Sequence, residues 1–68
     1  MIASPYHIDV HYPGERMSRE RCDLDSAQAV LDAIPTMLQA HSGCERLVVW
    51  VGPTRLFAVD CRGERLED

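Results

Sequence analysis

Residues 46–61, RLVVWVGPTRLFAVDC, decide the fold of this chain. Two runs rich in β-branched and aromatic residues, 46–51 and 56–61, flank a turn over 52–55 that contains glycine and proline. Two such runs joined by a short turn are typical of a β-hairpin. The sequence therefore predicts an antiparallel pair of strands in this half of the chain.

Both faces of this hairpin are predicted to be apolar. We place Val51 opposite Leu56 across the turn, so that Trp50 pairs with Phe57. An antiparallel sheet covered by a helix on one side usually has a polar second face. In this register one face carries Leu47, Val49, Val51, Leu56 and Ala58, and the other carries Val48, Trp50, Phe57, Val59 and Cys61.

The second apolar face predicts an interaction surface, because exposed apolar patches mark binding sites. Aromatic pairs such as Trp50 and Phe57 are typical interface anchors, and Val48 and Val59 complete the surface. We expect a non-enzymatic protein–protein interaction or regulatory module that forms a homodimer through 46–61, or that binds one larger protein. In the alternative, the N-terminal segment or the tail covers this face, or the sheet curls over it, and both aromatic residues belong to the core.

The N-terminal stretch YHIDVHY, residues 6–12, predicts a half-buried strand because polar and apolar residues alternate. Pro13 and Gly14 then predict a type II turn. The chain is expected to return as an edge strand over 16–22, whose charges suit a sheet edge. The apolar face of the first strand carries Tyr6, Ile8, Val10 and Tyr12, and its polar face carries His7, Asp9 and His11.

A helix is predicted to follow, with Asp25 as N-cap and Gln28 as its capping-box partner. Pro35 lacks the backbone donor that a helix interior needs, so we expect a kink there, or else a break at which Pro35 opens a second short helix. Gly43 is predicted to end the helix as its C′ residue. The apolar stripe that would face the sheet consists of Ala27, Val30, Leu31, Ile34, Met37 and Leu38.

These elements occur in the order β-β-α-β-β, which predicts an α+β fold in a single domain, 1–68. Its expected architecture is two-layered: a four-stranded antiparallel sheet with one Pro-kinked helix on one face. The polar residues 62–68 are expected to form a frayed tail. A single core of this size supplies only about 3–5 kcal/mol, so small domains gain stability from disulfides, metals or partner chains.

The composition narrows the classes of partner. The 68 residues carry a net charge of −4, and all seven positive charges are arginines. This makes nucleic acid an unexpected partner, since its binding needs clustered positive charge. The absence of lysine suggests a GC-rich bacterial or phage origin. One alternative function is therefore an accessory inhibitor of the anti-CRISPR-like class that mimics an acidic partner.

Location and redox state follow from the same composition. Cys22, Cys44 and Cys61 are odd in number and lack a CxxC spacing, which argues against a disulfide framework. The first five residues do not resemble a secretory signal, and no run of about 20 apolar residues could span a membrane. We expect a cytoplasmic protein without membrane contact.

Two further alternatives involve polar clusters. His7, Asp9 and His11 could bind zinc or iron if Cys22 or Glu20 supplied another ligand. Arg16, Arg19 and Arg21 could bind phosphate or nucleic acid, although interleaved acidic residues neutralise them. No catalytic or cofactor-binding motif is present. We therefore assign no catalytic residue and no cofactor, and expect that the protein is not an enzyme.

Overall fold

The computed structural model describes residues 5–66. Three sequence-based expectations concern positions outside this range. The expected absence of a signal sequence rests mainly on residues 1–4, as does the idea that the N-terminal segment covers a sheet face. The end of the expected frayed tail, residues 67–68, also lies outside the described residues.

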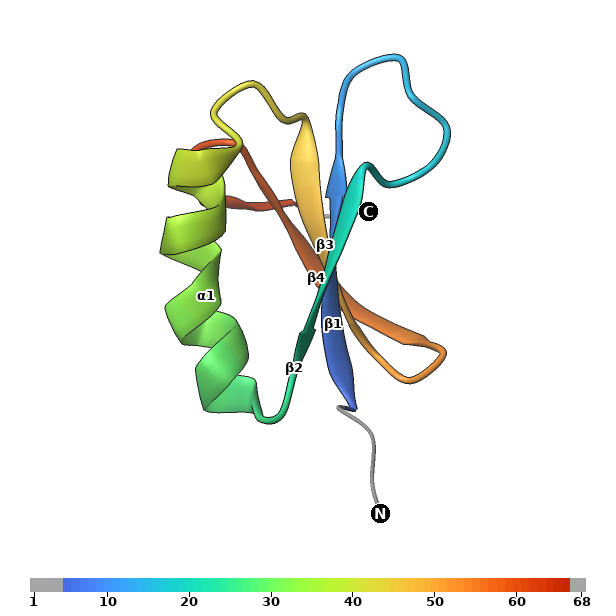
Figure 1. The fold of residues 1–68 in the computed structure, drawn as a ribbon, viewed down its shortest axis with the longest axis vertical. Coiled ribbons are helices and arrows are strands. Elements are labelled where there is room, and N and C mark those ends of the chain that lie inside the picture. Colours follow the sequence, from blue (N-terminus) through green and yellow to red (C-terminus); the bar gives the residue numbers. More distant parts are fainter. Residues whose placement is uncertain (1–4, 67–68) are drawn as a thin grey trace.

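The chain folds into one antiparallel sheet with one helix on one face (Figure 1). This confirms the predicted α+β class, but the sheet has five strands instead of four, in the order β2-β1-β3-β4-β5. No helix within residues 5–66 combines the length and apolar character needed to cross a bilayer. The elements are β1 (Tyr6–His11), β2 (Glu20–Leu24), α1 (Ala27–Ala40), β3 (Arg46–Val51), β4 (Thr54–Asp60) and β5 (Arg65–Leu66).

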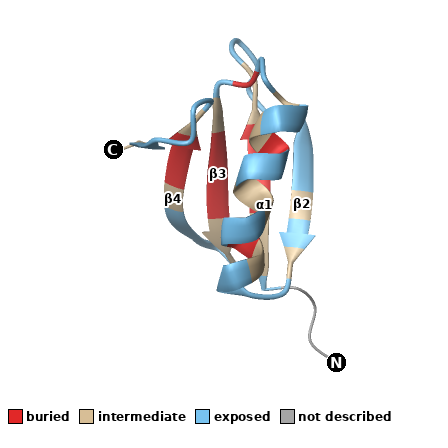
Figure 2. Cartoon of the chain, turned by 90° about the vertical axis from the view of Figure 1, so that its left-hand side faces the viewer, coloured by how far each residue is buried: buried red, intermediate tan, exposed pale blue. Residues whose placement is uncertain are grey.

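The core lies between α1 and the middle of the sheet, where the buried residues are concentrated (Figure 2). The largest fully buried side chains are Ile8, Val10, Leu47 and Val49, all on β1 and β3. These two strands occupy the centre of the sheet, so their apolar faces are covered by α1 and by neighbouring strands. The core cluster consists of Ile8, Val10, Val30, Met37, Cys44, Leu47, Val49 and Val59.

The turn after β1 forms as predicted, but the return strand starts later. Glu15 N donates to Tyr12 O at 3.2 Å, and Gly14 has φ of 79°, as the third residue of a type II turn requires. β2 begins only at Glu20, because the residues before it form a loop in which Arg19 pairs with Glu15. The predicted range 16–22 is therefore wrong at both ends, whereas the edge position is confirmed.

The helix begins one residue later than predicted. Ser26, not Asp25, is the N-cap, and its Oγ accepts from Ala29 N at 3.1 Å. Gln28 does not act in a capping box but donates to Asp32 Oδ1 at 3.1 Å. A hydroxyl and a carboxylate cap a helix about equally well, so propensity alone does not separate two adjacent candidates.

The rest of α1 differs from the predicted pattern at its end and along its stripe. α1 passes through Pro35 without a break, and it ends at the C-cap His41, whose N–H donates to Met37 O. Gly43 is not in the left-handed region, so the prediction that it is the C′ residue is wrong. Of the predicted stripe, Leu31 is 56% exposed and Ala27 is exposed, while the remaining members contact the core.

The hairpin register differs from the prediction by two residues beside the turn and by one residue beyond a β-bulge. Val51 lies opposite Thr54, so the turn holds only two residues, and a β-bulge between Val49 and Trp50 then shifts the pairing. Val49 consequently faces Phe57, where we had predicted Ala58. A shift of one residue moves every side chain of a strand to the other face. Trp50 and Val48 therefore do not share a face with Phe57 and Val59, as the prediction assumed, because the two β4 residues pack on the helix side.

Part of the predicted tail forms β5, and Asp60 holds the turn that leads to it. Asp60 Oδ1 accepts from Arg62 N and from Glu64 N, both at 2.9 Å. Asp60 N in turn donates to Glu64 O at 2.8 Å. These bonds direct residues 65–66 back along Ala58 and Val59, so the sheet gains a strand where fraying was expected.

This turn is predicted to open at low pH. The backbone N–H groups of Glu64 and then Arg62 lower the pKa of Asp60. A carboxylate with a lowered folded-state pKa stabilises the fold fully above its unfolded-state value, about 3.9, and loses this contribution as the pH falls through the folded-state value. We expect the amide signals of residues 62–66 to shift and to lose exchange protection, relative to the intrinsic rate at each pH, below about pH 4 and before the central strands do.

Asp60→Asn is the matched control for this prediction, because its side-chain oxygen can still accept both bonds but does not titrate. NMR spectra recorded during an acid titration should show the local step in the original chain and not in the variant. The same step in both proteins would assign the acid sensitivity to another group.

Candidate binding surface

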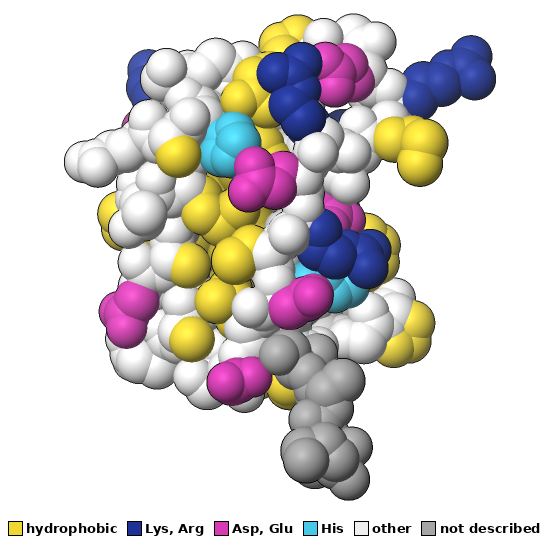
Figure 3. All heavy atoms as spheres, in the orientation of Figure 1, with side chains coloured by type: hydrophobic (Ala, Val, Ile, Leu, Met, Phe, Trp, Pro, Cys, Tyr) yellow, Lys and Arg dark blue, Asp and Glu magenta, His cyan; other side chains and the backbone are white. Residues whose placement is uncertain are grey.

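The face of the sheet opposite α1 carries a set of polar and aromatic side chains, and we call it the open face. It is defined by the strand pairing, since residues directly opposite one another share a face. Most arginine side chains visible in Figure 3 lie on the sheet side, whereas apolar side chains line the seam between α1 and the sheet. The open face consists of His7, Asp9, His11, Arg21, Asp23, Arg46, Val48, Trp50, Arg55, Ala58, Asp60 and Leu66.

The open face is not the exposed apolar patch that the sequence predicted. Its apolar centre is small and covered, with Val48 only 5% and Ala58 0% exposed. Longer polar side chains surround this centre, so the face as a whole is mixed in character. The large apolar side chains that are exposed within the described residues lie elsewhere: Met17, Leu31 and Leu56.

A shallow hollow of about 420 Å³ lies on the open face. Its lining contributes two guanidinium groups, one imidazole and one indole, and no carboxylate. Two of its donors, Trp50 Nε1 and Arg46 Nε, are buried and have no hydrogen-bond acceptor. A buried donor without an acceptor costs about 1–3 kcal/mol. The hollow is lined by His11, Arg46, Val48, Trp50 and Arg55.

The indole that forms one wall of this hollow is held in place by a neighbouring ring. His7 lies opposite Trp50 across β1 and β3, and the two rings stack with 6.0 Å between centroids and 13° between planes. Stacked rings restrict each other's rotamers, so the wall is pre-organised before any ligand arrives.

The polar face of β1 forms as predicted, but its residues are not assembled as metal ligands. His7 stacks on Trp50, and Asp9 accepts from Arg21 Nε at 3.2 Å. The proposed additional ligands, Cys22 and Glu20, lie opposite Ile8 and Val10 and so belong to the helix side of the sheet. Residues 5–66 contain no group of three His, Cys, Asp or Glu that could hold a metal ion.

The three arginines considered for phosphate binding are not brought together. Arg16 is exposed in the loop before β2. Arg19 lies over the Tyr12 ring, 3.7 Å from its centroid, and pairs with Glu15, whose hydrogen bond raises the pKa of the guanidinium. Arg21 pairs with Asp9 on the open face. Two of the three charges are therefore already engaged within the protein.

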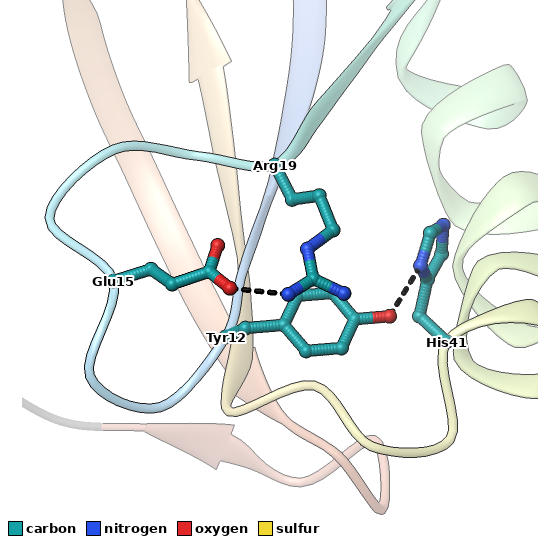
Figure 4. Close-up of polar contacts among 4 residues, drawn as sticks. All are labelled: Tyr12, Glu15, Arg19 and His41. Atoms are coloured by element: carbon teal, nitrogen blue, oxygen red, sulfur yellow. Dashed lines mark hydrogen bonds and ion pairs between the residues drawn. The ribbon is translucent and has the colours of Figure 1, made fainter.

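A polar cluster at the end of α1 was not predicted from the sequence (Figure 4). His41 Nε2 lies 3.0 Å from Glu20 Oε1, and His41 Nδ1 lies 2.8 Å from the Tyr12 hydroxyl. A carboxylate can only accept, so Nε2 donates to it, and Nδ1 shares a hydrogen bond with the tyrosine hydroxyl. These two contacts of His41 join the end of α1 to β1 and β2, which assigns His41 a structural role. The residues of this cluster are far apart in sequence, so no local motif predicts the cluster.

A second, apolar hollow of about 120 Å³ lies between the first half of α1 and β4. Leu31 and Leu56, both exposed, lie on its rim. It presents almost no polar surface, and so offers no group that would select one ligand over another. Its lining consists of Tyr6, Ala27, Val30, Leu31, Val49, Leu56 and Phe57.

The hollow beside Trp50 is therefore the described site with the most specific chemistry. It combines fixed aromatic surface, positive charge and unpaired donors. Comparison of this chain with protein-family models, with curated proteins and with solved structures finds no match.

Proposed function

We propose that this chain is a non-enzymatic protein–protein interaction module that binds an acidic segment of a partner protein on its open face. The observation that carries the proposal is the hollow beside Trp50, where the Nε atoms of Arg46 and the indole find no acceptor. A carboxylate is acceptor-only and negatively charged, so it complements both properties of the site.

The energetics favour a charged acceptor over a neutral one. A hydrogen bond to a charged group contributes about 1.5–3 kcal/mol, more than a neutral pair. Arginine and tryptophan are also the residues that most often dominate the binding energy of protein interfaces. A carboxylate bound by Arg46 with the neighbouring apolar carbons against Trp50 would use both side chains at once.

The charge distribution favours a protein segment over nucleic acid. The chain as a whole has a net charge of −4, which opposes a long polyanion. The positive charge of the hollow is local, because Asp9 neutralises Arg21 on the same face. A short acidic segment can contact the arginines of the hollow without lying against the acidic remainder of the surface. A bacterial or phage accessory inhibitor would be one instance of such a module.

Trp50 is the only tryptophan, so its fluorescence reports on this site directly. We expect a saturable emission change when the protein is titrated with a synthetic Glu-rich peptide, and little change with the same peptide carrying Gln. Arg46→Gln should weaken binding about tenfold or more, because one charge-assisted bond is lost. Arg16→Gln removes the same charge from an exposed loop and should bind like the original chain.

Three outcomes would contradict the proposal. The first is no response of Trp50 to the Glu-rich peptide. The second is an equal loss of binding in both arginine variants, which would show only a general charge effect. The third is tighter binding of a single-stranded oligonucleotide than of the peptide at matched salt, which would assign the hollow to nucleic acid.

A further inference from the structure

Within residues 5–66 the outer edge of β2 has no paired strand, and the strand pairing shows which of its backbone groups face outward. Pro5 O accepts from Gly52 N at 2.9 Å, so the odd-numbered residues of β1 bond to β3. Val10 O, on the other side of β1, accepts from Arg19 N at 2.8 Å. Even-numbered β1 residues therefore bond toward β2.

This alternation fixes the orientation of the β2 backbone. Glu20, Cys22 and Leu24 lie opposite even-numbered β1 residues, so their backbone groups point inward. Arg21 and Asp23 consequently direct their N–H and C=O groups to the outer edge. A strand that added to this edge would bond to these two residues.

The sequence of β2, ERCDL, is complementary to itself around its central residue. When two copies pair antiparallel with Cys22 opposite Cys22, Arg21 of each lies opposite Asp23 of the other. Centring the pairing on Arg21 or on Asp23 would instead place like charges opposite each other, which is destabilising. The register centred on Cys22 therefore pairs opposite charges. It also brings the outward-facing N–H and C=O groups of Arg21 opposite those of Asp23 in the other copy.

We propose that two copies of this chain associate through β2, antiparallel and centred on Cys22, and so join their sheets into one. The side chains then form a row across the junction in which charge alternates: Asp9 and Arg21 of the first copy, then Asp23 of the second copy. Arg21 would lie between two carboxylates instead of one. Pairing also satisfies the edge groups that an isolated β2 leaves to solvent.

The position of the helix leaves room for this association. In Figure 2, α1 lies in front of the middle of the sheet and β2 lies to its side. The two β1 strands would be three strand spacings apart, about 14 Å. This exceeds the roughly 8–10 Å between the axes of packed helices, so the two copies of α1 need not overlap. Both open faces would lie on the same side of the joined sheet.

Charge reversal at the edge tests the proposed pairing. We expect the original chain to be a dimer by light scattering and sedimentation. Asp23→Arg places arginines opposite each other, and Arg21→Glu places carboxylates opposite each other, so each variant should dimerise at least about tenfold more weakly. An equimolar mixture of the two variants restores both opposite-charge pairs and should form a heterodimer.

The matched control is Glu45→Arg, which makes the same charge change at an exposed position just before β3. It should dimerise like the original chain. A monomeric original chain overturns the proposal, as does dimerisation of Asp23→Arg at unchanged strength. A mixture that remains monomeric although each variant is folded by circular dichroism also overturns it.

Cross-linking gives an independent readout that needs no variant. Cys22, Cys44 and Cys61 are all free thiols. In the proposed register the two Cys22 residues form a non-hydrogen-bonded pair, with Cα atoms about 4.5 Å apart, which is within reach of a disulfide. Mild oxidation should therefore produce a Cys22–Cys22 link between chains, identified by mass spectrometry.

An interchain link through Cys61 alone would contradict this register. The dimer goes beyond the binding function proposed for the open face and can fail separately from it. Arg46→Gln, which changes a side chain on β3 and not on the β2 edge, should still dimerise although it weakens binding of the Glu-rich peptide.

Discussion

Leu47→Ala is expected to lower the free energy of unfolding by about 2–5 kcal/mol, which is most of the stability of a domain this small. Leu47 is fully buried on the central strand β3, where it lies between Val10 of β1 and Val59 of β4. Truncation removes its apolar contacts and leaves a cavity that two flanking strands prevent from collapsing. Urea unfolding followed by circular dichroism should show a largely unfolded chain.

Leu56→Ala is the matched control for this prediction. Leu56 is 44% exposed on β4, so the same truncation there should cost less than about 1 kcal/mol. Equal losses in the two variants would mean that the core is not centred on β3. A loss below about 1 kcal/mol in Leu47→Ala would mean that the site repacks around the smaller side chain.

The parts of the fold that sequence could predict depend on local pattern. Polar and apolar residues alternate strictly over residues 6–12. The apolar ones belong to the core beneath α1 or pack against it. Residues 46–51 combine β-branched and aromatic side chains and form β3 within the predicted bounds. The charged return strand lies at an edge, as expected. In each case neighbouring residues carry the information, because a period of two or a turn signal is read within a few positions.

The hairpin register could not be predicted because it depends on two small features. The turn uses two residues instead of four, and a bulge between Val49 and Trp50 then compensates part of that change. Either feature alone would alter which side chains share a face. The predicted interaction surface depended on this register, so Phe57 was assigned to the wrong side of the sheet while Trp50 was left on the open face.

The candidate site depends on contacts between distant parts of the sequence. The hollow combines His11 of β1 with Arg46 of β3 and Arg55 of β4, and no spacing within one segment connects them. Its unpaired donors are visible only once burial is known. The complementarity of ERCDL, by contrast, is present in the sequence, but it gains meaning only when β2 is known to be an edge with Arg21 and Asp23 facing outward.

Glycine substitutions at two positions are expected to change stability in opposite directions. Gly63, in the turn before β5, has φ of 86°, and a Cβ there would lie 3.3 Å from Leu38 Cδ1 of α1. Gly63→Ala should therefore destabilise the chain by about 1–2 kcal/mol, since a side chain in the left-handed region is strained.

Gly43→Ala should instead leave stability unchanged or raise it by about 0.4–1 kcal/mol, because it reduces the freedom of the unfolded chain. Gly43 lies outside the left-handed region, and its Cβ would make an ordinary contact at 3.9 Å with Tyr12 Cε2. Urea unfolding would measure both effects, and amide exchange should show the loss in Gly63→Ala concentrated at residues 65–66. Equal effects of the two substitutions would mean that the turn before β5 is not constrained by its backbone, and β5 would then be the frayed tail that composition alone predicts.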